Sequence, residues 1–430
     1  MILWPHYLAA GKNKVRRYLN ILLRITTLGA RFLFVLALAK FLDPAQVGLY
    51  GLFTASIGYT LYFVGLDFYT YVTREILRHP EGERGRILKA QAALSGCLYV
   101  IVLPVSLVLL IWTDMPALLI WWFTPILILE HFNQEVSRLL IALSRQITAS
   151  IVLFLRQASW AIAAVVLMAL EPESRSLATV LALWSAAGLA AALLGAWAVS
   201  RLDMGRWRAA VDWRWVKQGI KVSLGFLAAT IALRSVQTFD RYWLEAIGGL
   251  ELVGAYVLFM GVAGSLLTFL DAGVFAFTYP DLIRHNHQQE HDLARALVRR
   301  SLLQTVAVAA AFSVVSVIAL PYLLRWIANP VYQANIWLYP WLLTAMIVNA
   351  IGLIPHYGLY ARGRDKPIIL SHLAALGAFV AATWLLSASH ATLAVPIGLN
   401  VAFVVILIWK TAAYLVMEFR RTGAGVILTP

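Results

Sequence analysis

Apolar runs of about 20 residues recur from one end of this chain to the other and constrain its fold more than any other feature. As α-helices, such runs can cross a hydrocarbon core of about 30 Å, because a helix rises about 1.5 Å per residue. With 61% hydrophobic residues, 13% charged residues and a mean hydropathy of +0.77, the composition is that of an all-α polytopic membrane protein. The predicted spans are twelve, at about residues 18–41, 47–72, 88–112, 117–137, 147–170, 177–200, 222–244, 252–279, 301–323, 336–360, 367–387 and 392–416.

Basic residues divide the loops between these spans into two classes. They gather in the N-terminal segment, in every second loop after it and beyond the last span, whereas the opposite loops carry Lys40, Arg175, Arg241 and Arg325. Because Lys and Arg are retained in the cytoplasm during insertion, both termini are expected to be cytoplasmic. The loop after span six, RWRAAVDWRWVKQGIK, mixes tryptophans with arginines, which is typical of an interfacial amphipathic helix.

A weak internal repeat relates the two halves of the chain. FLDPAQVGLYGLF (41–53) links spans one and two, and AIGGLELVGAYVLF (246–259) links spans seven and eight. The matched residues are Gly48 and Gly254, Tyr50 and Tyr256, and, toward the ends of the following helices, Asp67 and Asp271. The repeat predicts two parallel six-helix lobes, residues 1–200 and 222–430, joined by a cytoplasmic interfacial linker at 201–221.

Four motifs together carry a family resemblance: LAKFLDPAQVGLY, GLDFYTYVTREI, TFDRYWLEAIGGLELVGAY and FTYPDL. With the helix number and the repeat, they resemble the Wzx-type polysaccharide-precursor flippases of the multidrug/oligosaccharidyl-lipid/polysaccharide (MOP) exporter superfamily. The resemblance implies two lobes around a central cavity in the bacterial inner membrane. It further implies that an undecaprenyl-diphosphate-linked oligosaccharide crosses to the external leaflet by alternating access, for O-antigen, capsule or exopolysaccharide synthesis. Polysaccharide polymerase or assembly proteins are the partners that it suggests.

Two arginines lie inside the first span. Arg24 and Arg31 are seven residues apart, so they lie about 20° apart on one helix face, with Thr27 between them. An unpaired cation at such depth costs at least about 2.5–3.5 kcal/mol and therefore needs a watered cavity or a partner. Guanidinium binds phosphate oxygens in a bidentate way, so a diphosphate headgroup is the predicted ligand. An ion pair with a buried acid is the alternative.

Two more arginines are predicted to line the substrate path. Arg156 falls about 15 Å into span five and Arg234 about 18 Å into span seven. Arg234 would supply the second lobe with a cation, as Arg31 does for the first. Glu130 in span four differs in depth from Arg156 by about 6 Å. Pairing of these two side chains and contact of Arg156 with substrate are both open.

The buried acids are candidates for coupling or gating. Glu130 and Glu135 in span four could take up H+ or Na+ in one conformation and release it in the other, and the alternative is a structural ion pair. Asp67 and Asp271 are expected near the cytoplasmic mouth, with Arg74 on the same helix face as Asp67. They would form gate ion pairs between the lobes, or else simple ion pairs at helix ends.

Some polar residues have ordinary structural interpretations. Lys410 is expected within about 5 Å of the inner face, where it would extend its ammonium to water. His356 and Tyr357 could contact sugar, although buried hydrogen bonding is the simpler interpretation. Asp240 and Arg241 are expected to serve local structure.

The sequence also bears on four other functions: nucleotide-driven transport, metal binding, drug export and catalysis on lipid-linked glycans. It contains no Walker A motif, so no nucleotide is expected to drive transport, and no cofactor is expected. The single cysteine, Cys97, offers no metal cluster. A cation-coupled multidrug exporter of the same superfamily would favour an acidic and aromatic cavity. A membrane enzyme acting on lipid-linked glycans would need larger external segments than the short external loops that this sequence predicts.

Overall fold

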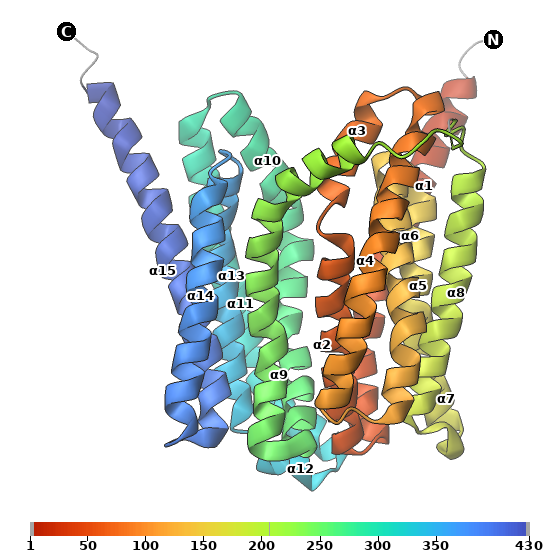
Figure 1. Cartoon of the computed structure of the whole chain (residues 1–430). Helices are drawn as coiled ribbons and strands as arrows, with labels where there is room; N and C mark the ends of the chain where they lie inside the picture. Colours follow the sequence, from red (N-terminus) through yellow and green to blue (C-terminus); the bar gives the residue numbers. More distant parts are fainter. Residues whose placement is uncertain (1–3, 206, 427–430) are drawn as a thin grey trace. The chain divides into compact units, whose positions relative to one another are not determined.

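A computed structural model describes the backbone of residues 4–205 and 207–426, and the side chains of 22–23, 25–205, 207–225 and 227–420. Within these residues the chain is almost entirely helical and forms no strand (Figure 1). The chain divides into two compact units. Unit 1 comprises residues 1–42 and 56–227, and unit 2 comprises residues 43–55 and 228–430.

Unit 1 contains the helices of the first half of the chain. They are α1 (Trp4–Phe41), α3 (Tyr69–Arg78), α4 (Arg84–Trp112), α5 (Ala117–Ala142), α6 (Gln146–Phe154), α7 (Trp160–Leu170) and α8 (Leu177–Ser200), together with the second part of α2 (Pro44–Gly65) and the start of α9 (Trp213–Leu270). A π-helical turn, η2 (Leu155–Ser159), joins α6 to α7, so these three elements form one continuous span. Short 3-10 turns at Glu81–Glu83 and Pro172–Ser174 complete the unit.

Unit 2 contains the first part of α2, most of α9 and all later helices. These are α10 (Ala276–His287), α11 (His291–Ile327), α12 (Pro330–Ala334), α13 (Leu338–Tyr360), α14 (Asp365–Ser387) and α15 (Ala391–Val426). A second π-helical turn, η4 (Asp271–Phe275), connects α9 to α10. Within α9 the chain turns at Gly249, whose φ of 74° suits a residue without a side chain. Helix α15 packs along both α13 and α14.

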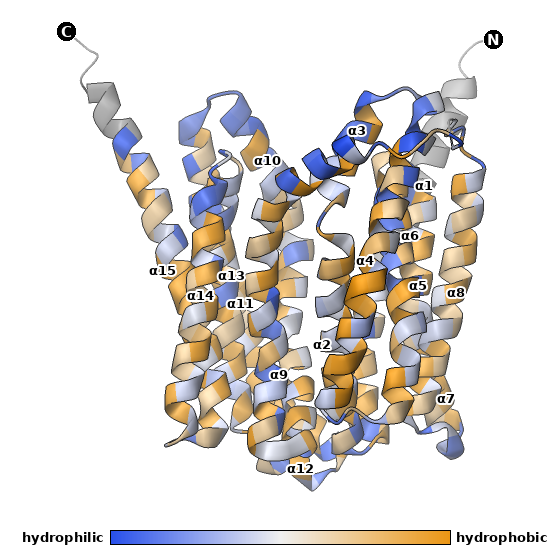
Figure 2. Ribbon diagram, in the orientation of Figure 1, coloured by the Kyte–Doolittle hydropathy of each residue, from blue (hydrophilic) through white to orange (hydrophobic). Residues whose placement is uncertain are grey.

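Each of the twelve expected spans corresponds to a helical segment. The bounds of α8 are those predicted, and the helices carry hydrophobic residues along their middles with hydrophilic ends (Figure 2). By length and composition alone, nine helical stretches within the described residues could cross a membrane, and one of them contains both arms of α9. The chain is therefore a multi-pass membrane protein.

The second span is shorter than predicted. Helix α2 ends at Gly65, because Leu66 and Asp67 adopt left-handed backbone conformations with φ of 49° and 50°. Two such residues cannot continue a right-handed helix. The prediction that Asp67 and Arg74 share one helix face is therefore wrong, since α3 starts only at Tyr69.

The segment after α8 is anchored to unit 1. Within the described part of 201–212 the backbone is irregular, and the remainder of the stretch expected to be an interfacial amphipathic helix forms the start of α9 from Trp213. Lys89 donates to the Ala209 carbonyl at 2.9 Å. The ring of Trp215 lies 5.6 Å from that of Phe68. The segment is therefore held by side chains of α3, α4 and the α2–α3 turn.

The two repeated glycines pack against each other's turns within unit 2. A Cβ at Gly48 would lie 2.2 Å from the carbonyl oxygen of Leu250, and one at Gly254 would lie 2.0 Å from that of Pro44. Both distances are far below van der Waals contact, and the obstructing atoms belong to backbone. The close approach of α2 to the second arm of α9 explains why both copies of the repeat have glycine at this position.

Candidate functional site

A buried ion pair joins α5 to the π-helical turn in unit 1. Arg156 donates from Nε to Glu130 Oε2 at 2.7 Å, and its Nη2 lies 2.7 Å from the same oxygen. Both side chains are 10% exposed. Trp184 of α8 donates from Nε1 to the other carboxylate oxygen of Glu130 at 2.8 Å. Both oxygens are thus engaged, so the pairing that the sequence left open is present. Substrate contact by Arg156 stays a prediction.

The π-helical turn explains how Arg156 reaches Glu130. Such a turn adds one residue to a helix and re-aims the side chains within it, and it occurs frequently at functional sites. Within this turn the carbonyl of Arg156 accepts a hydrogen bond from Trp160 Nε1 at 2.9 Å. Trp160 in turn stacks on Trp184 with ring centroids 5.2 Å apart. Two tryptophans therefore cover the ion pair.

Glu135 belongs to a second polar cluster one turn further along α5. Arg138 pairs with its Oε1 at 2.7 Å, and Gln91 of α4 donates to its Oε2 at 2.5 Å. The guanidinium of Arg138 lies over the ring of Tyr69, 3.5 Å from the centroid. This is the structural ion pair that formed one interpretation of Glu135. Its ion-coupling role stays a prediction.

The residues proposed from the first span differ in exposure. Arg31 is exposed on α1, and no ion pair of its side chain is present among the described residues. Thr27 is buried, and its hydroxyl donates to the Leu23 carbonyl at 2.7 Å. The side chain of Arg24 lies outside the described residues. Among the described side chains of this set, Arg31 presents an exposed guanidinium to a ligand.

Two of the three candidate gate residues, Asp67 and Asp271, lie where a regular α-helix is interrupted. Asp67 is buried at the break after α2, and its carbonyl accepts a hydrogen bond from the Thr70 hydroxyl at 2.9 Å. Arg74 is exposed on α3. Asp271 is exposed as the first residue of η4, at the position that the repeat matches with Asp67. Both aspartates thus mark places where the regular α-helix is interrupted, and gating stays a prediction.

Arg234 is exposed on the first arm of α9, where its Nη1 donates to Gln237 Oε1 at 3.0 Å. One turn further, Asp240 is buried and accepts from the hydroxyl of Tyr256 at 2.5 Å and from the backbone N–H of Arg241 at 2.7 Å. Tyr256 is the tyrosine of the repeated Gly-x-Tyr motif. Asp240 and Tyr256 therefore tie the two arms of α9 together, which is a structural role.

Sequence reasoning expected hydrogen bonding for His356 but missed the cluster in unit 2 to which it belongs. Lys410 of α15 is 3% exposed, with its Nζ 3.1 Å from His356 Nδ1 of α13 and 3.0 Å from His372 Nε2 of α14. The prediction that Lys410 reaches water at the membrane surface is wrong, because α15 continues to Val426, about 24 Å beyond Lys410. The available signal was one basic or imidazole side chain within the apolar stretch of each of three helices.

Unit 2 also has a polar cluster at the end of α15. Arg362 pairs with Glu418 and donates from Nε to Asn286 Oδ1 at 2.9 Å. The Nε of Arg295 lies 4.0 Å from Glu418 Oε2. These residues fasten the α10–α11 and α13–α14 turns to α15.

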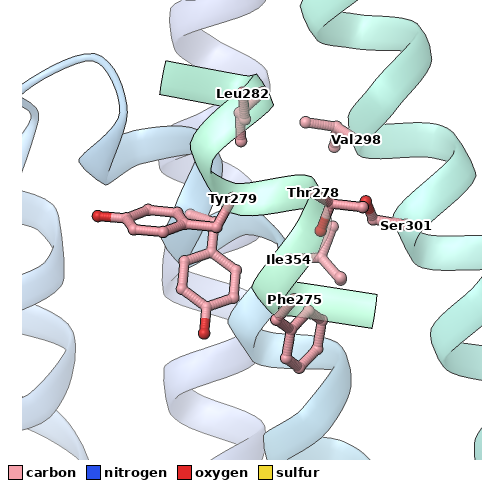
Figure 3. A pocket seen from close by; sticks show the side chains of 8 residues that line it. Phe275, Thr278, Tyr279, Leu282, Val298, Ser301 and Ile354 are labelled. Atoms are coloured by element: carbon pink, nitrogen blue, oxygen red, sulfur yellow. The ribbon is translucent and has the colours of Figure 1, made fainter. Parts of the chain in front are cut away.

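A pocket in unit 2 lies between α10, α11 and α13. Figure 3 shows the side chains of its eight lining residues: Phe275, Thr278, Tyr279, Leu282, Val298, Ser301, Ile354 and Tyr357. The rings of Tyr279 and Tyr357 are 4.9 Å apart, and Thr278 donates to the Val274 carbonyl of its own helix. The lining is aromatic, aliphatic and hydroxyl-bearing, so this pocket has no cation for an anionic ligand. No group of three or more metal-ligating side chains occurs in the described part of the chain.

Comparison with known proteins shows which family the sequence matches and which solved structures have a similar fold. Residues 18–280 match the family model described as polysaccharide biosynthesis protein. Among solved structures, the chain resembles a multidrug resistance MATE family transporter of the MOP superfamily, with a TM-score of 0.74 and 12% identity over 92% of this chain and 99% of that one. A MATE transporter from Vibrio cholerae gives a TM-score of 0.59 and 13% identity over 95% and 98%.

A third structure is a MOP superfamily transporter from Pyrococcus furiosus, with a TM-score of 0.55 and 15% identity over 94% of this chain and 97% of that one. The reversed polarity of its binding pocket suggests a different function for that protein. No curated protein matches the chain. At these identities the structures show the fold, which is that of the MATE and MOP transporters.

Proposed function

Because this chain belongs to the polysaccharide biosynthesis protein family, we propose that it moves an undecaprenyl-diphosphate-linked oligosaccharide from the cytoplasmic to the external leaflet of the bacterial inner membrane. Its MATE/MOP fold supports movement by alternating access. In this proposal both termini are cytoplasmic, and the product supplies a polymerase or other assembly protein of a cell-surface polysaccharide.

The observation that carries the proposal is the state of the charged groups in the spans. Arg31 and Arg234 are exposed, and Arg234 also donates to Gln237, whereas the acids Glu130, Glu135 and Asp240 are held by cations or hydrogen-bond donors. Exposed guanidinium groups at membrane depth favour an anionic substrate over the cationic drugs for which an acidic cavity would be expected. The reversed pocket polarity described for the Pyrococcus furiosus transporter is a precedent for such variation within the fold.

A diphosphate suits these arginines for a physical reason. Guanidinium stays charged throughout the physiological pH range and donates two parallel hydrogen bonds to phosphate oxygens. The headgroup would gain these bonds while its prenyl chain stays in lipid. Arg24 and Arg156 belong to the same proposed path, with Arg156 held by Glu130 until a substrate competes for it.

The test is transbilayer movement of a radiolabelled undecaprenyl-diphosphate oligosaccharide in proteoliposomes. Wild-type protein should accelerate movement, and Arg31→Ala should reduce the rate about tenfold or more, as expected for loss of a charge-assisted phosphate contact. The matched control is Arg299→Ala, an exposed arginine near the start of α11, which should transport like wild type.

The outcomes separate the candidate functions. Equal rates for wild type and Arg31→Ala would remove Arg31 from the substrate path. Absence of any protein-dependent movement of lipid-linked sugars, together with ion-driven efflux of a cationic dye, would replace the proposal with drug export.

A further inference from the structure

Lys410 presents a chemical problem that the proposed transport path does not explain. It is 3% exposed within unit 2, and no carboxylate among the described residues forms an ion pair with it. An ammonium in apolar surroundings is costly unless its charge is compensated. The partners of Lys410 are two imidazole nitrogens, which can accept hydrogen bonds without carrying negative charge.

The hydrogen bonds around the cluster assign its tautomers. His372 Nδ1 lies 3.2 Å from the backbone carbonyl oxygen of Ala229 on α9, which can only accept, so this nitrogen carries the proton. Its Nε2 is therefore free to accept from Lys410. His356 Nδ1 likewise faces Lys410 Nζ as an acceptor, which places the proton of that ring on Nε2.

This arrangement is compatible with two charge states of Lys410. An ammonium has three N–H donors and a neutral amine has two, so either form can donate one hydrogen bond to each imidazole. A proton can bind or leave without breaking the contacts that join α13, α14 and α15. Arg156 differs, because guanidinium stays charged and its carboxylate partner fixes it.

The remaining titratable groups nearby do not supply a fixed counter-charge. On α13 the ring of Tyr360 stacks against His356 with centroids 6.3 Å apart, and Tyr357 lies on the adjoining side. On α15 the next turns carry Tyr414 and Glu418, and Glu418 pairs with Arg362. From α14 and α9 the cluster receives His372 and the Ala229 carbonyl.

We propose that Lys410, His356 and His372 form a site that binds and releases one proton during the transport cycle. Its use in transport rests on the proposed function, whereas proton binding itself does not. The bound proton adds one positive charge to the interior of unit 2, so the protonated and neutral forms favour different hydration of these helices. A pH gradient could then bias the conformational cycle without a carboxylate at this position.

The first experiment measures proton binding directly. Purified protein in detergent is titrated between about pH 5 and pH 9, a range in which an ordinary lysine does not titrate, and wild type is compared with Lys410→Met. Wild type should bind one proton more than the variant over this range. Lys366→Met, at an exposed lysine of α14, is the matched control and should follow wild type. Equal proton uptake by wild type and Lys410→Met overturns the proposal.

The second experiment uses Lys410→Arg, which keeps a cation and a long side chain but cannot lose its proton, and it serves also if Lys410→Met does not yield monodisperse protein. In proteoliposomes, a gradient of one pH unit can bias a one-proton process by at most about tenfold. Wild-type transport should respond to the gradient, and Lys410→Arg should give the same rate with and without it. A gradient response that persists in Lys410→Arg overturns the coupling role.

The two proposals fail in different ways. If wild type moves no lipid-linked oligosaccharide but binds the extra proton, the flippase proposal fails and the proton site stands. If transport proceeds and the titration difference is absent, the proton-site proposal fails and the flippase proposal stands.

Discussion

The two units each bury a cation, and they stabilise it in different ways. In unit 1, Arg156 has a carboxylate partner that is itself held by Trp184. In unit 2, Lys410 has two imidazoles and no carboxylate among the described residues. The first arrangement fixes both charges, because removal of either partner leaves the other buried alone. The second leaves the charge of the lysine free to change. The comparison distinguishes a cation whose charge is fixed by a carboxylate partner from one whose partners allow its charge to change.

The largest effect is expected from Arg156→Met. It leaves the carboxylate of Glu130 buried without its cation, so the free energy of unfolding should fall by about 3–5 kcal/mol. SDS titration in mixed micelles measures this loss. The exposed Arg299→Met should change the same quantity by no more than about 0.5 kcal/mol. If both variants lose equal stability, the ion pair contributes nothing and the contrast between the units is wrong.

The double variant Arg156→Met/Glu130→Leu sharpens the same test. It removes both charges, so most of the stability lost in Arg156→Met should return. Additive losses would instead indicate that the two side chains act independently.

An intermediate effect is expected from Trp184→Phe. The change removes the indole N–H that donates to Glu130 but keeps an aromatic ring beside Trp160. A hydrogen bond to a charged acceptor contributes about 1.5–3 kcal/mol, which is the expected loss in the SDS titration. Trp121→Phe, at an exposed tryptophan of α5, is the control and should be close to neutral. A neutral Trp184→Phe would mean that Arg156 alone holds the carboxylate.

The smallest effect is expected from Lys410→Met. It removes two hydrogen bonds but also an uncompensated cation, and the two contributions offset each other to within about 1 kcal/mol of wild-type stability. The same SDS titration, with Lys366→Met beside it, measures the difference. A loss of stability as large as that of Arg156→Met would show that Lys410 is a fixed structural cation. The proposed difference between the buried cations of the two units would then be wrong.

Hydropathy located the spans because apolar length is a local property of the sequence. The bounds of α8 follow from its sequence alone, and depth along neighbouring helices was sufficient to suggest that Arg156 and Glu130 could pair. The end of α15 was harder, since its last turns are polar enough to resemble a loop. That error placed Lys410 at the surface instead of in the interior.

Breaks inside helices were not predictable in the same way. Nothing in GLDFY distinguishes a continuing helix from the left-handed pair Leu66 and Asp67, because residue propensities there differ by less than the free energy of tertiary packing. The sequence likewise does not predict the π-helical turns at Leu155–Ser159 and Asp271–Phe275. Each contains a charged residue that had been singled out, so charge identified the positions although it did not predict their geometry.

The reciprocal fit of Gly48 and Gly254 has a consequence for how the chain can change by mutation. Copies of a duplicated segment ordinarily diverge independently, but here each glycine is confined by a backbone oxygen of the other copy, at Leu250 and at Pro44. A larger residue in one copy is tolerated only if the other copy moves. Functional selection from a random library should therefore recover substitutions at either glycine mainly as pairs, with a second change in the opposite turn. Two segments separated by about half the chain are therefore expected to change together rather than independently.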